Sequence, residues 1–325
     1  MMVFSRTNTN SSIGLDIGRS TIKAIQLQKR EDGKIGLLAY GVSTQPNKKA
    51  VDSVLHPHNY HSLLANLLQT PNFGTFIDRE FVVSLPSRHT YIQHNVPSDM
   101  FVQQANKKLG TTIEDLLINT HKYNESNSVS IATAQNIFQP HFDTLNAHGL
   151  VIQTDHEITA AIRSINTASR QTLFVGLGAY STTIGIYNSY LISAENVEFG
   201  THHFIDNLSQ VLNLTFDQAK ELLFNFGFLP SSVRIKIIEV SKDIMAEFIK
   251  TLHHIIDYVN PDNIILYGGG ASIPGIADYL QIEFKIPVTV GNPWQRIGKY
   301  PLKPLPRKVA PMFATAIGLA ILGLE

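Results

Sequence analysis

The chain has 325 residues, of which 43% are hydrophobic and 16% are charged, which favours a globular protein of about two domains. Its 26 Lys and Arg residues balance its 26 Asp and Glu residues, so no net charge favours binding to nucleic acid or to an anionic membrane. Cysteine is absent, which excludes disulfides, thiolate metal sites and a cysteine nucleophile and fits a reducing compartment.

The N-terminal residues 1–12 are polar and rich in Asn, Ser and Thr, and we predict that they are disordered. They lack the basic region and apolar core of a signal peptide. No uninterrupted apolar stretch reaches the ~18 residues that span a bilayer. We therefore expect a cytoplasmic protein with no direct membrane insertion and no nucleic-acid partner.

Residues 13–27 form the first predicted element, a β-hairpin with the sequence Ile-Gly-Leu-Asp-Ile-Gly-Arg-Ser-Thr-Ile-Lys-Ala-Ile-Gln-Leu. Asp16 lies near the end of its first strand, where a carboxylate can hold the water shell of Mg²⁺. Gly18 would let the backbone approach phosphate oxygens closely. The alternative is a surface hairpin in which Asp16 and Gly18 only make the turn.

A different pattern begins after a predicted buried strand at 81–85 and continues from 90 to about 150. A strand-like segment at 90–96 leads into a polar helix at 99–109, and an amphipathic helix follows at 136–148. This arrangement predicts a small α/β subdomain inserted into the first domain.

A strand at 150–154 and a helix at 157–166 lead back into the first domain, and Asp155-His156-Glu157 lies at their junction. Two acids flanking a histidine at the mouth of a cleft could polarise a water molecule or position a metal ion. Acids at a helix N-terminus also favour the helix macrodipole, and we assign Asp155 to this role. Glu157 remains a candidate catalytic residue.

Residues 172–187 repeat the pattern of the first hairpin about half a chain later. Their turn carries glycines and hydroxyls, but Gly176 stands where the first copy has Asp16. A repeat of one supersecondary unit at this spacing predicts two similar domains facing each other across a cleft. Such turns offer backbone N–H groups and hydroxyls that suit phosphate oxygens, so the cleft is a candidate nucleotide site.

A third glycine-rich turn, residues 268–275, joins a buried strand to a helix. Its three consecutive glycines permit close packing of a flat ligand, or of a phosphate at the helix N-terminus, although a tight turn alone explains them equally well. Strands alternating with helices predict an α/β protein, in an order that is not that of a Rossmann fold. The other elements predicted in this half are helices at 201–212, after the N-cap Thr215, at 231–259, at 276–284 and within 310–324, and strands at 263–267 and 288–290.

The 13 histidines include a group at 56–61 and adjacent pairs at 202–203 and 253–254. None has the spacing of a motif such as His-Glu-x-x-His. We expect them to be solvated or polar-face residues rather than metal ligands.

Taken in order, these motifs resemble the actin-like ATPase superfamily, and most closely the PilM family of type IV pilus assembly proteins, relatives of the division protein FtsA. The resemblance extends from about residue 13 to residue 322. It is carried by 14–23 (like the first phosphate motif), 173–184 (the second), 197–200 with 214–219 (the stretch that follows), 265–276 (the adenosine motif) and 313–320 (the closing helix).

The resemblance implies an actin-like (ribonuclease H-like, duplicated) two-lobed fold, with a first lobe at 13–165 that contains the insert and a second lobe at 172–325. ATP and Mg²⁺ would bind between the lobes, with Asp16 organising the cation through metal-bound water. The residues implied to bind nucleotide are Asp16, Gly18, Ser20, Thr21, Gly178, Ser181, Thr182, Gly269 and Gly270.

The resemblance also implies a cytoplasmic adaptor for a type IV pilus or a related secretion machine, held at the inner membrane by its partners. The partners would be the N-terminal cytoplasmic peptide of a PilN-like membrane protein and other cytoplasmic components of the machine. ATP would then act as a structural or switching ligand.

One departure from the family concerns hydrolysis, since the second phosphate motif usually begins with an Asp and here has Gly176. We therefore expect no efficient ATPase activity. Two alternatives remain: a filament-forming protein of the FtsA type, and a sugar-kinase-like phosphotransferase. The latter would need Asp155 or Glu157 as its catalytic base.

Overall fold

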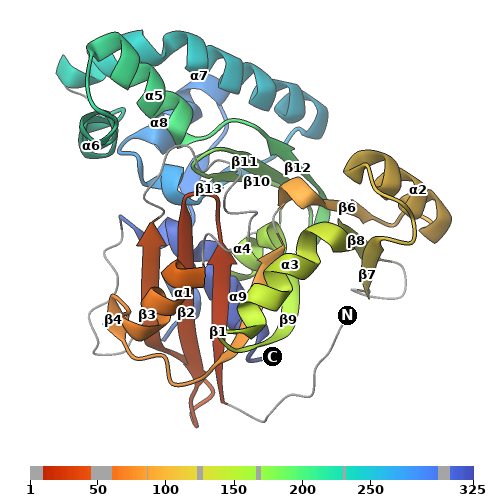
Figure 1. Ribbon diagram of the computed structural model, residues 1–325. Helices are drawn as coiled ribbons and strands as arrows, with labels where there is room; N and C mark the ends of the chain where they lie inside the picture. Colours follow the sequence, from red (N-terminus) through yellow and green to blue (C-terminus); the bar gives the residue numbers. More distant parts are fainter. Residues whose placement is uncertain are drawn as a thin grey trace.

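The structure is a computed structural model that describes residues 10–44, 61–85, 87–122, 127–165, 170–229, 232–298 and 308–325. Two mixed β-sheets, of six and eight strands, face each other with helices around and between them (Figure 1). Most of the predicted disordered segment 1–12 lies outside the described residues. Its last two residues, Ser11 and Ser12, pair with β2 as the start of the first strand.

The first sheet has the strand order β4-β3-β2-β1-β5-β9. Helices cover both faces of this sheet, and successive side chains of a strand point to opposite faces. In β5, Phe81 and Val83 pack with helices α1 and α3, whereas Val82 packs with α4 and α9. The strands are β1 Ser11–Ile17, β2 Thr21–Lys29, β3 Ile35–Thr44, β4 Phe73–Gly74, β5 Glu80–Leu85 and β9 Leu150–His156. The helices are α1 His61–Gln69, α3 Gln135–Asn146, α4 Glu157–Ile165 and α9 Ala314–Leu322.

The second sheet has the order β14-β13-β10-β11-β12-β6-β8-β7. Its last three strands come from the predicted insert, and they join the sheet where Gln93 of β6 pairs with Ser193 of β12. The insert therefore follows β5 of the first sheet in sequence but extends the second sheet in space. The strands are β6 Thr90–His94, β7 Leu116–Lys122, β8 Ser128–Ala134, β10 Thr172–Leu177, β11 Thr182–Tyr187, β12 Leu191–Val197, β13 Asn263–Tyr267 and β14 Val288–Val290.

Helices α5 to α8 cover the outer face of the second sheet, at the top of Figure 1. The predicted cap of α6 is confirmed, since Thr215 Oγ1 accepts from the Gln218 backbone N–H at 3.2 Å and Gln218 Oε1 accepts from the Thr215 backbone N–H at 2.9 Å. The remaining helices are α2 Ser98–Leu109, which packs on β6 and β8, α5 Thr201–Leu212, α6 Phe216–Phe226, α7 Ser232–Val259 and α8 Ile276–Phe284.

The internal repeat of the sequence is also a repeat of structure. The β1–β2 turn closes with a hydrogen bond from the Gly18 N–H to the Thr21 carbonyl at 3.0 Å, and the β10–β11 turn closes in the same way from Gly178 to Ser181, also at 3.0 Å. Each hairpin also has a parallel neighbour on its first strand, β5 for β1 and β13 for β10. The two copies therefore present matching turns.

Helices α4 and α9 lie between the two sheets and touch each other. Helix α4 packs on β10 and β13 of the second sheet, and α9 packs on β1 and β2 of the first. Their contact is close because Gly318 has no side chain, and a Cβ built there would lie 1.7 Å from the carbonyl oxygen of Ala160. This close helix pair therefore joins the two sheets.

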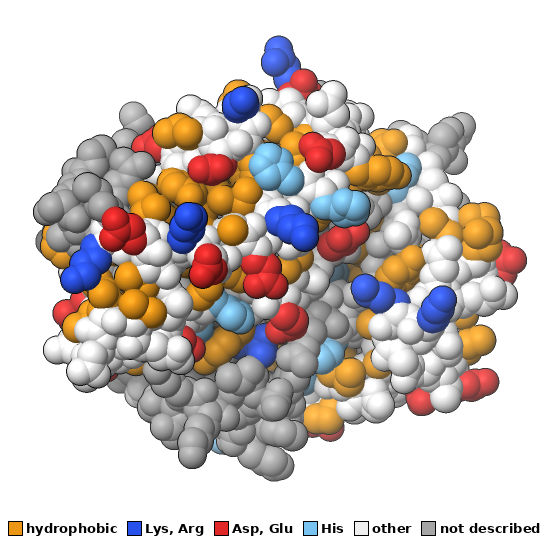
Figure 2. Space-filling model, turned by 90° about the horizontal axis from the view of Figure 1, so that it is seen from above, with side chains coloured by type: hydrophobic (Ala, Val, Ile, Leu, Met, Phe, Trp, Pro, Cys, Tyr) orange, Lys and Arg blue, Asp and Glu red, His pale blue; other side chains and the backbone are white. Residues whose placement is uncertain are grey.

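The surface agrees with the balanced charge. On the face that carries the helices at the top of Figure 1, acidic and basic side chains are interspersed, and neither sign forms a large patch (Figure 2). Among the described residues, no helix has the length and apolar character to cross a membrane.

Candidate functional site

A cavity of about 380 Å³ lies between the turns of the two hairpins, a size typical of small-ligand pockets at roughly 300–1,000 Å³. The sequence singled out ten residues, the nine implied to bind nucleotide and the catalytic candidate Glu157. Eight of them line the cavity: Asp16, Gly18, Ser20, Thr21, Glu157, Gly178, Ser181 and Gly269. A larger cavity of about 560 Å³, lined in part by Lys29, Tyr190 and Arg296, contains none of the ten.

The other two residues, Thr182 and Gly270, do not line the cavity but fix the turns that do. The Thr182 hydroxyl is fully buried and donates to the Phe199 carbonyl at 2.7 Å, so it fixes the second turn. A Cβ on Gly270 would lie 2.3 Å from Leu177 Cγ, so the absence of a side chain lets the glycine-rich turn pack on β10. Gly269, by contrast, has no atom within 4 Å of an added Cβ and borders open space.

Asp16 is held at the end of β1 by a buried ion pair. Lys23 Nζ donates to its Oδ2 at 2.7 Å, and the Ser84 hydroxyl donates to its Oδ1 at 3.4 Å. Both charged side chains are about nine-tenths buried and line the cavity. An ammonium and a carboxylate therefore face the cavity together, and Lys23 would offer a cation to a phosphate group.

Arg19 links the two turns across the cleft. Its Nη1 donates to Glu198 Oε2 of the second half at 3.0 Å, and its guanidinium carbon lies 4.9 Å from the ring centre of Tyr180 in the second turn. Because the Arg19 side chain comes from the first turn, these contacts connect the two halves of the chain beside the cavity.

Glu157 begins α4 and faces the cavity. Its Oε1 accepts from the Thr183 hydroxyl at 2.5 Å. Burial raises the pKa of the Glu157 carboxyl, the hydrogen bond from Thr183 opposes the rise, and the charge of Asp16 adds to it. Glu157 therefore adds a second carboxyl group to the cavity, besides the Asp16–Lys23 ion pair.

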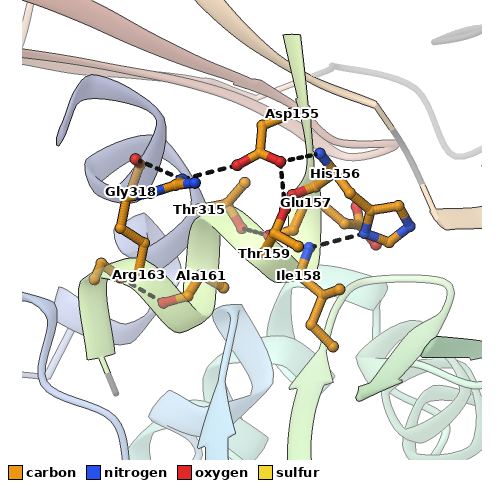
Figure 3. Close-up of polar contacts among 10 residues, drawn as sticks. Asp155, His156, Glu157, Ile158, Thr159, Ala161, Arg163, Thr315 and Gly318 are labelled. Atoms are coloured by element: carbon orange, nitrogen blue, oxygen red, sulfur yellow. Dashed lines mark hydrogen bonds and ion pairs between the residues drawn. The ribbon is translucent and has the colours of Figure 1, made fainter. Parts of the chain in front are cut away.

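Asp155 is not among the residues that line the cavity, and it bonds instead to groups of α4 (Figure 3). Its carboxylate accepts from the His156 backbone N–H at 2.7 Å, from the Thr159 hydroxyl, and from Arg163 at 2.8 Å. Arg163 also donates to the Gly318 carbonyl of α9 at 3.2 Å. These bonds place Asp155 at the start of α4, next to the helix pair.

The neighbouring His156 is 1% exposed, and burial lowers the pKa of its imidazole to about 4. Unfolding exposes it to water, where its pKa is about 6.5, so the unfolded chain binds more protons between these values and stability falls as pH falls. We expect the wild type to lose about 2 kcal/mol more unfolding free energy than His156→Asn between pH 7 and pH 5, measured by urea denaturation.

The exposed His254 offers the control for this measurement, because His254→Asn should follow the wild type at both pH values. In the His156→Asn variant, the new amide oxygen can still accept the Ile158 N–H that now bonds His156 Nδ1 at 3.2 Å. Equal pH dependence of His156→Asn and the wild type would contradict the burial of a neutral imidazole.

The donor set fits Mg²⁺ bound together with a nucleotide rather than by protein alone. Asp16, Glu157 and Ser84 supply the oxygen atoms that Mg²⁺ prefers, and Mg²⁺ commonly takes its remaining ligands from phosphates and water. Within the described ranges no three His, Asp or Glu side chains gather at a metal-binding distance.

Among the cavity residues that were not singled out from the sequence are Lys23, Arg19 and Tyr267. Lys23 had a signal, because a lysine inside the apolar run Ile22–Ile25 needs a partner. Arg19 and Tyr267 had none, because their contacts come from the other half of the chain or from a neighbouring strand.

A comparison with protein-family models matches residues 173–318 to the cell division protein FtsA. No curated protein sequence matches the chain. Among solved structures, the fold is similar to that of the PilM-PilN type IV pilus biogenesis complex, with 19% identity, a TM-score of 0.78 and coverage of 97% of this chain and 98% of that chain.

Two more distant structures share the fold. They are the ethanolamine utilization protein EutJ from Carboxydothermus hydrogenoformans (13% identity, TM-score 0.57, 98% of this chain and 92% of that chain) and MreB 5 of Spiroplasma citri bound to AMPPNP (13%, 0.55, 97% and 96%). At these identities the likenesses show the fold, and the predicted actin-like α/β fold is confirmed.

Proposed function

We propose that this protein binds MgATP in the cleft and acts as a cytoplasmic adaptor in the assembly of a type IV pilus or a related machine. The observation that supports nucleotide binding most directly is the pair of matching glycine turns, one from each sheet, on a single cavity. Their backbone N–H groups, with Lys23 and the hydroxyls of Ser20, Thr21 and Ser181, suit the phosphates. MreB 5 of similar fold was solved with AMPPNP bound.

The far end of the cavity suits an adenosine. Gly268, Gly269 and Ser272 of the third turn line the same cavity as Lys220 and Phe224 of α6, and together they offer glycine backbone, an aromatic ring and polar groups. Asp16 would hold the Mg²⁺ through its water shell. With Gly176 in place of an acid, we propose slow turnover or none, so that ATP stabilises one arrangement of the lobes.

The proposed partner is a PilN-like inner-membrane protein, bound through its N-terminal cytoplasmic peptide and joined by other cytoplasmic components of the machine. The likeness in fold to the PilM-PilN complex supports this proposal. The protein would then be peripheral at the inner membrane without inserting into it.

Calorimetry tests both parts of the proposal. MgATP titrated into the wild type is expected to bind one site with micromolar affinity, and the partner peptide is expected to bind with an affinity that differs between nucleotide-free and MgATP-saturated protein. A scrambled peptide is the control. No heat of binding for MgATP would exclude the nucleotide site, and equal peptide affinities would exclude the switch.

A filament of the FtsA type is the second candidate, favoured by the family match over residues 173–318. Sedimentation of the purified protein separates the two functions, since only a filament pellets in a MgATP-dependent manner.

A further inference from the structure

The position that lacks the second acid, Gly176, is covered by the ring of Tyr267. The two residues are register partners on the parallel strands β10 and β13. A Cβ built on Gly176 would lie 2.3 Å from Tyr267 Cζ and 2.5 Å from its hydroxyl oxygen. The phenol therefore occupies the space that a side chain at position 176 would need.

The Tyr267 side chain borders the cavity, and its hydroxyl oxygen is buried without a partner among the described residues. The residue is only 5% exposed, its ring packs in the core beside Phe174 and Ile158, and the side chain lines the cleft. Among the described residues no hydrogen-bond partner reaches its oxygen. A buried polar group left in this state costs about 1–3 kcal/mol, so a partner from a ligand would remove the cost.

The hydroxyl is a donor at neutral pH. Burial raises the pKa of Tyr267 well above its usual value, and the nearby carboxylates of Glu157 and Asp16 raise it further. A protonated phenol donates a hydrogen bond to a phosphate oxygen, whereas an aspartate at position 176 would repel one. The protonated phenol cannot accept a proton from water as a carboxylate can.

We propose that Tyr267 is a ligand-contacting residue that donates its hydroxyl hydrogen to the terminal phosphate of a bound nucleoside triphosphate, from the place that an acid at position 176 would take. This inference rests on the proposed nucleotide site and adds a preference to it: the cleft favours a triphosphate over a diphosphate. The hydrogen bond from Tyr267 would be made to a charged oxygen of the terminal phosphate, which a diphosphate lacks, and hydrogen bonds to charged oxygens are strong enough to give such a preference.

The test is calorimetry of AMPPNP and ADP, each with Mg²⁺, on the wild type and on Tyr267→Phe. We expect the variant to bind AMPPNP about tenfold more weakly and ADP as the wild type does, because only the hydroxyl is lost and the ring still fills the space. Tyr187→Phe is the matched control, since its hydroxyl donates to the Ser189 carbonyl outside the cleft.

The outcomes are distinguishable. A wild type that binds neither nucleotide overturns the proposed function itself. A wild type that binds both, with Tyr267→Phe unchanged toward AMPPNP or weakened equally toward ADP, overturns only the role of Tyr267.

A second measurement tests the geometry without any nucleotide. Gly176→Ala should lower the urea midpoint of unfolding in the wild type, because its Cβ meets the ring, and should have little effect in a Tyr267→Ser background. An equal loss in both backgrounds would show that Tyr267 does not cover Gly176.

Discussion

Replacing Gly318 by alanine is expected to lower the free energy of unfolding by at least about 3 kcal/mol, as measured by urea denaturation. The added Cβ would lie 1.7 Å from the Ala160 carbonyl oxygen and 2.4 Å from its carbon. Since both are backbone atoms, no side chain can rotate away, and helices α4 and α9 must separate. In an exposed helix the same substitution raises the free energy of unfolding by about 1 kcal/mol. A loss of stability in Gly318→Ala would therefore report the close contact of the two helices.

Gly36→Ala is the control, because its Cβ would make only ordinary van der Waals contacts, with the flexible side chain of Arg30 at 3.7 Å and the Gln28 carbonyl oxygen at 4.0 Å. We expect this variant to stay within about 0.5 kcal/mol of the wild type. A Gly318→Ala variant of wild-type stability would mean that the two helices are farther apart than described. Because this helix pair lies between the two sheets, such a result would also revise how the lobes face each other.

The elements that could be predicted from the sequence are those with a local signal. The hairpin at 13–27, the long helix α7 and the cap at Thr215 each follow from spacing or composition over a short window. Strand β12 was missed, and so was the joining of the insert to the second sheet. The pairing of Ser193 with Gln93 joins segments that are far apart in the chain, and no periodicity reports it.

The candidate site divides in the same way. Its turns could be found because glycine and hydroxyl residues repeat, but which atoms face the ligand depends on packing. Thr182 looks like a phosphate ligand in the sequence, yet its hydroxyl is used by the Phe199 carbonyl. The sequence shows that position 176 has no acid. It does not show that Tyr267 covers Gly176, because Tyr267 is distant in the sequence and is brought there by the parallel pairing of β10 and β13.

Asp16→Asn is expected to raise the Kd for MgATP by between about tenfold and a hundredfold in calorimetry, because the amide loses the charge that would hold the water shell of Mg²⁺. The shape of the side chain is kept, so the β1–β2 turn should be kept too. Asp32→Asn is the matched control. It removes a carboxylate that pairs with a lysine, Lys34, at 3.3 Å, but on the exposed β2–β3 turn, and it should bind MgATP as the wild type does.

The effect of Asp16→Asn on ATP affinity, measured with and without Mg²⁺, separates two roles for Asp16. If the carboxylate serves the cation, its loss weakens binding in Mg²⁺ but not in EDTA, where the freed Lys23 ammonium should hold ATP as tightly as before or more tightly. If the carboxylate only neutralises Lys23, Asp16→Asn strengthens ATP binding under both conditions. The second pattern would remove the metal role from Asp16 while leaving the nucleotide site intact, and it would identify Lys23 as the charge that the phosphates meet.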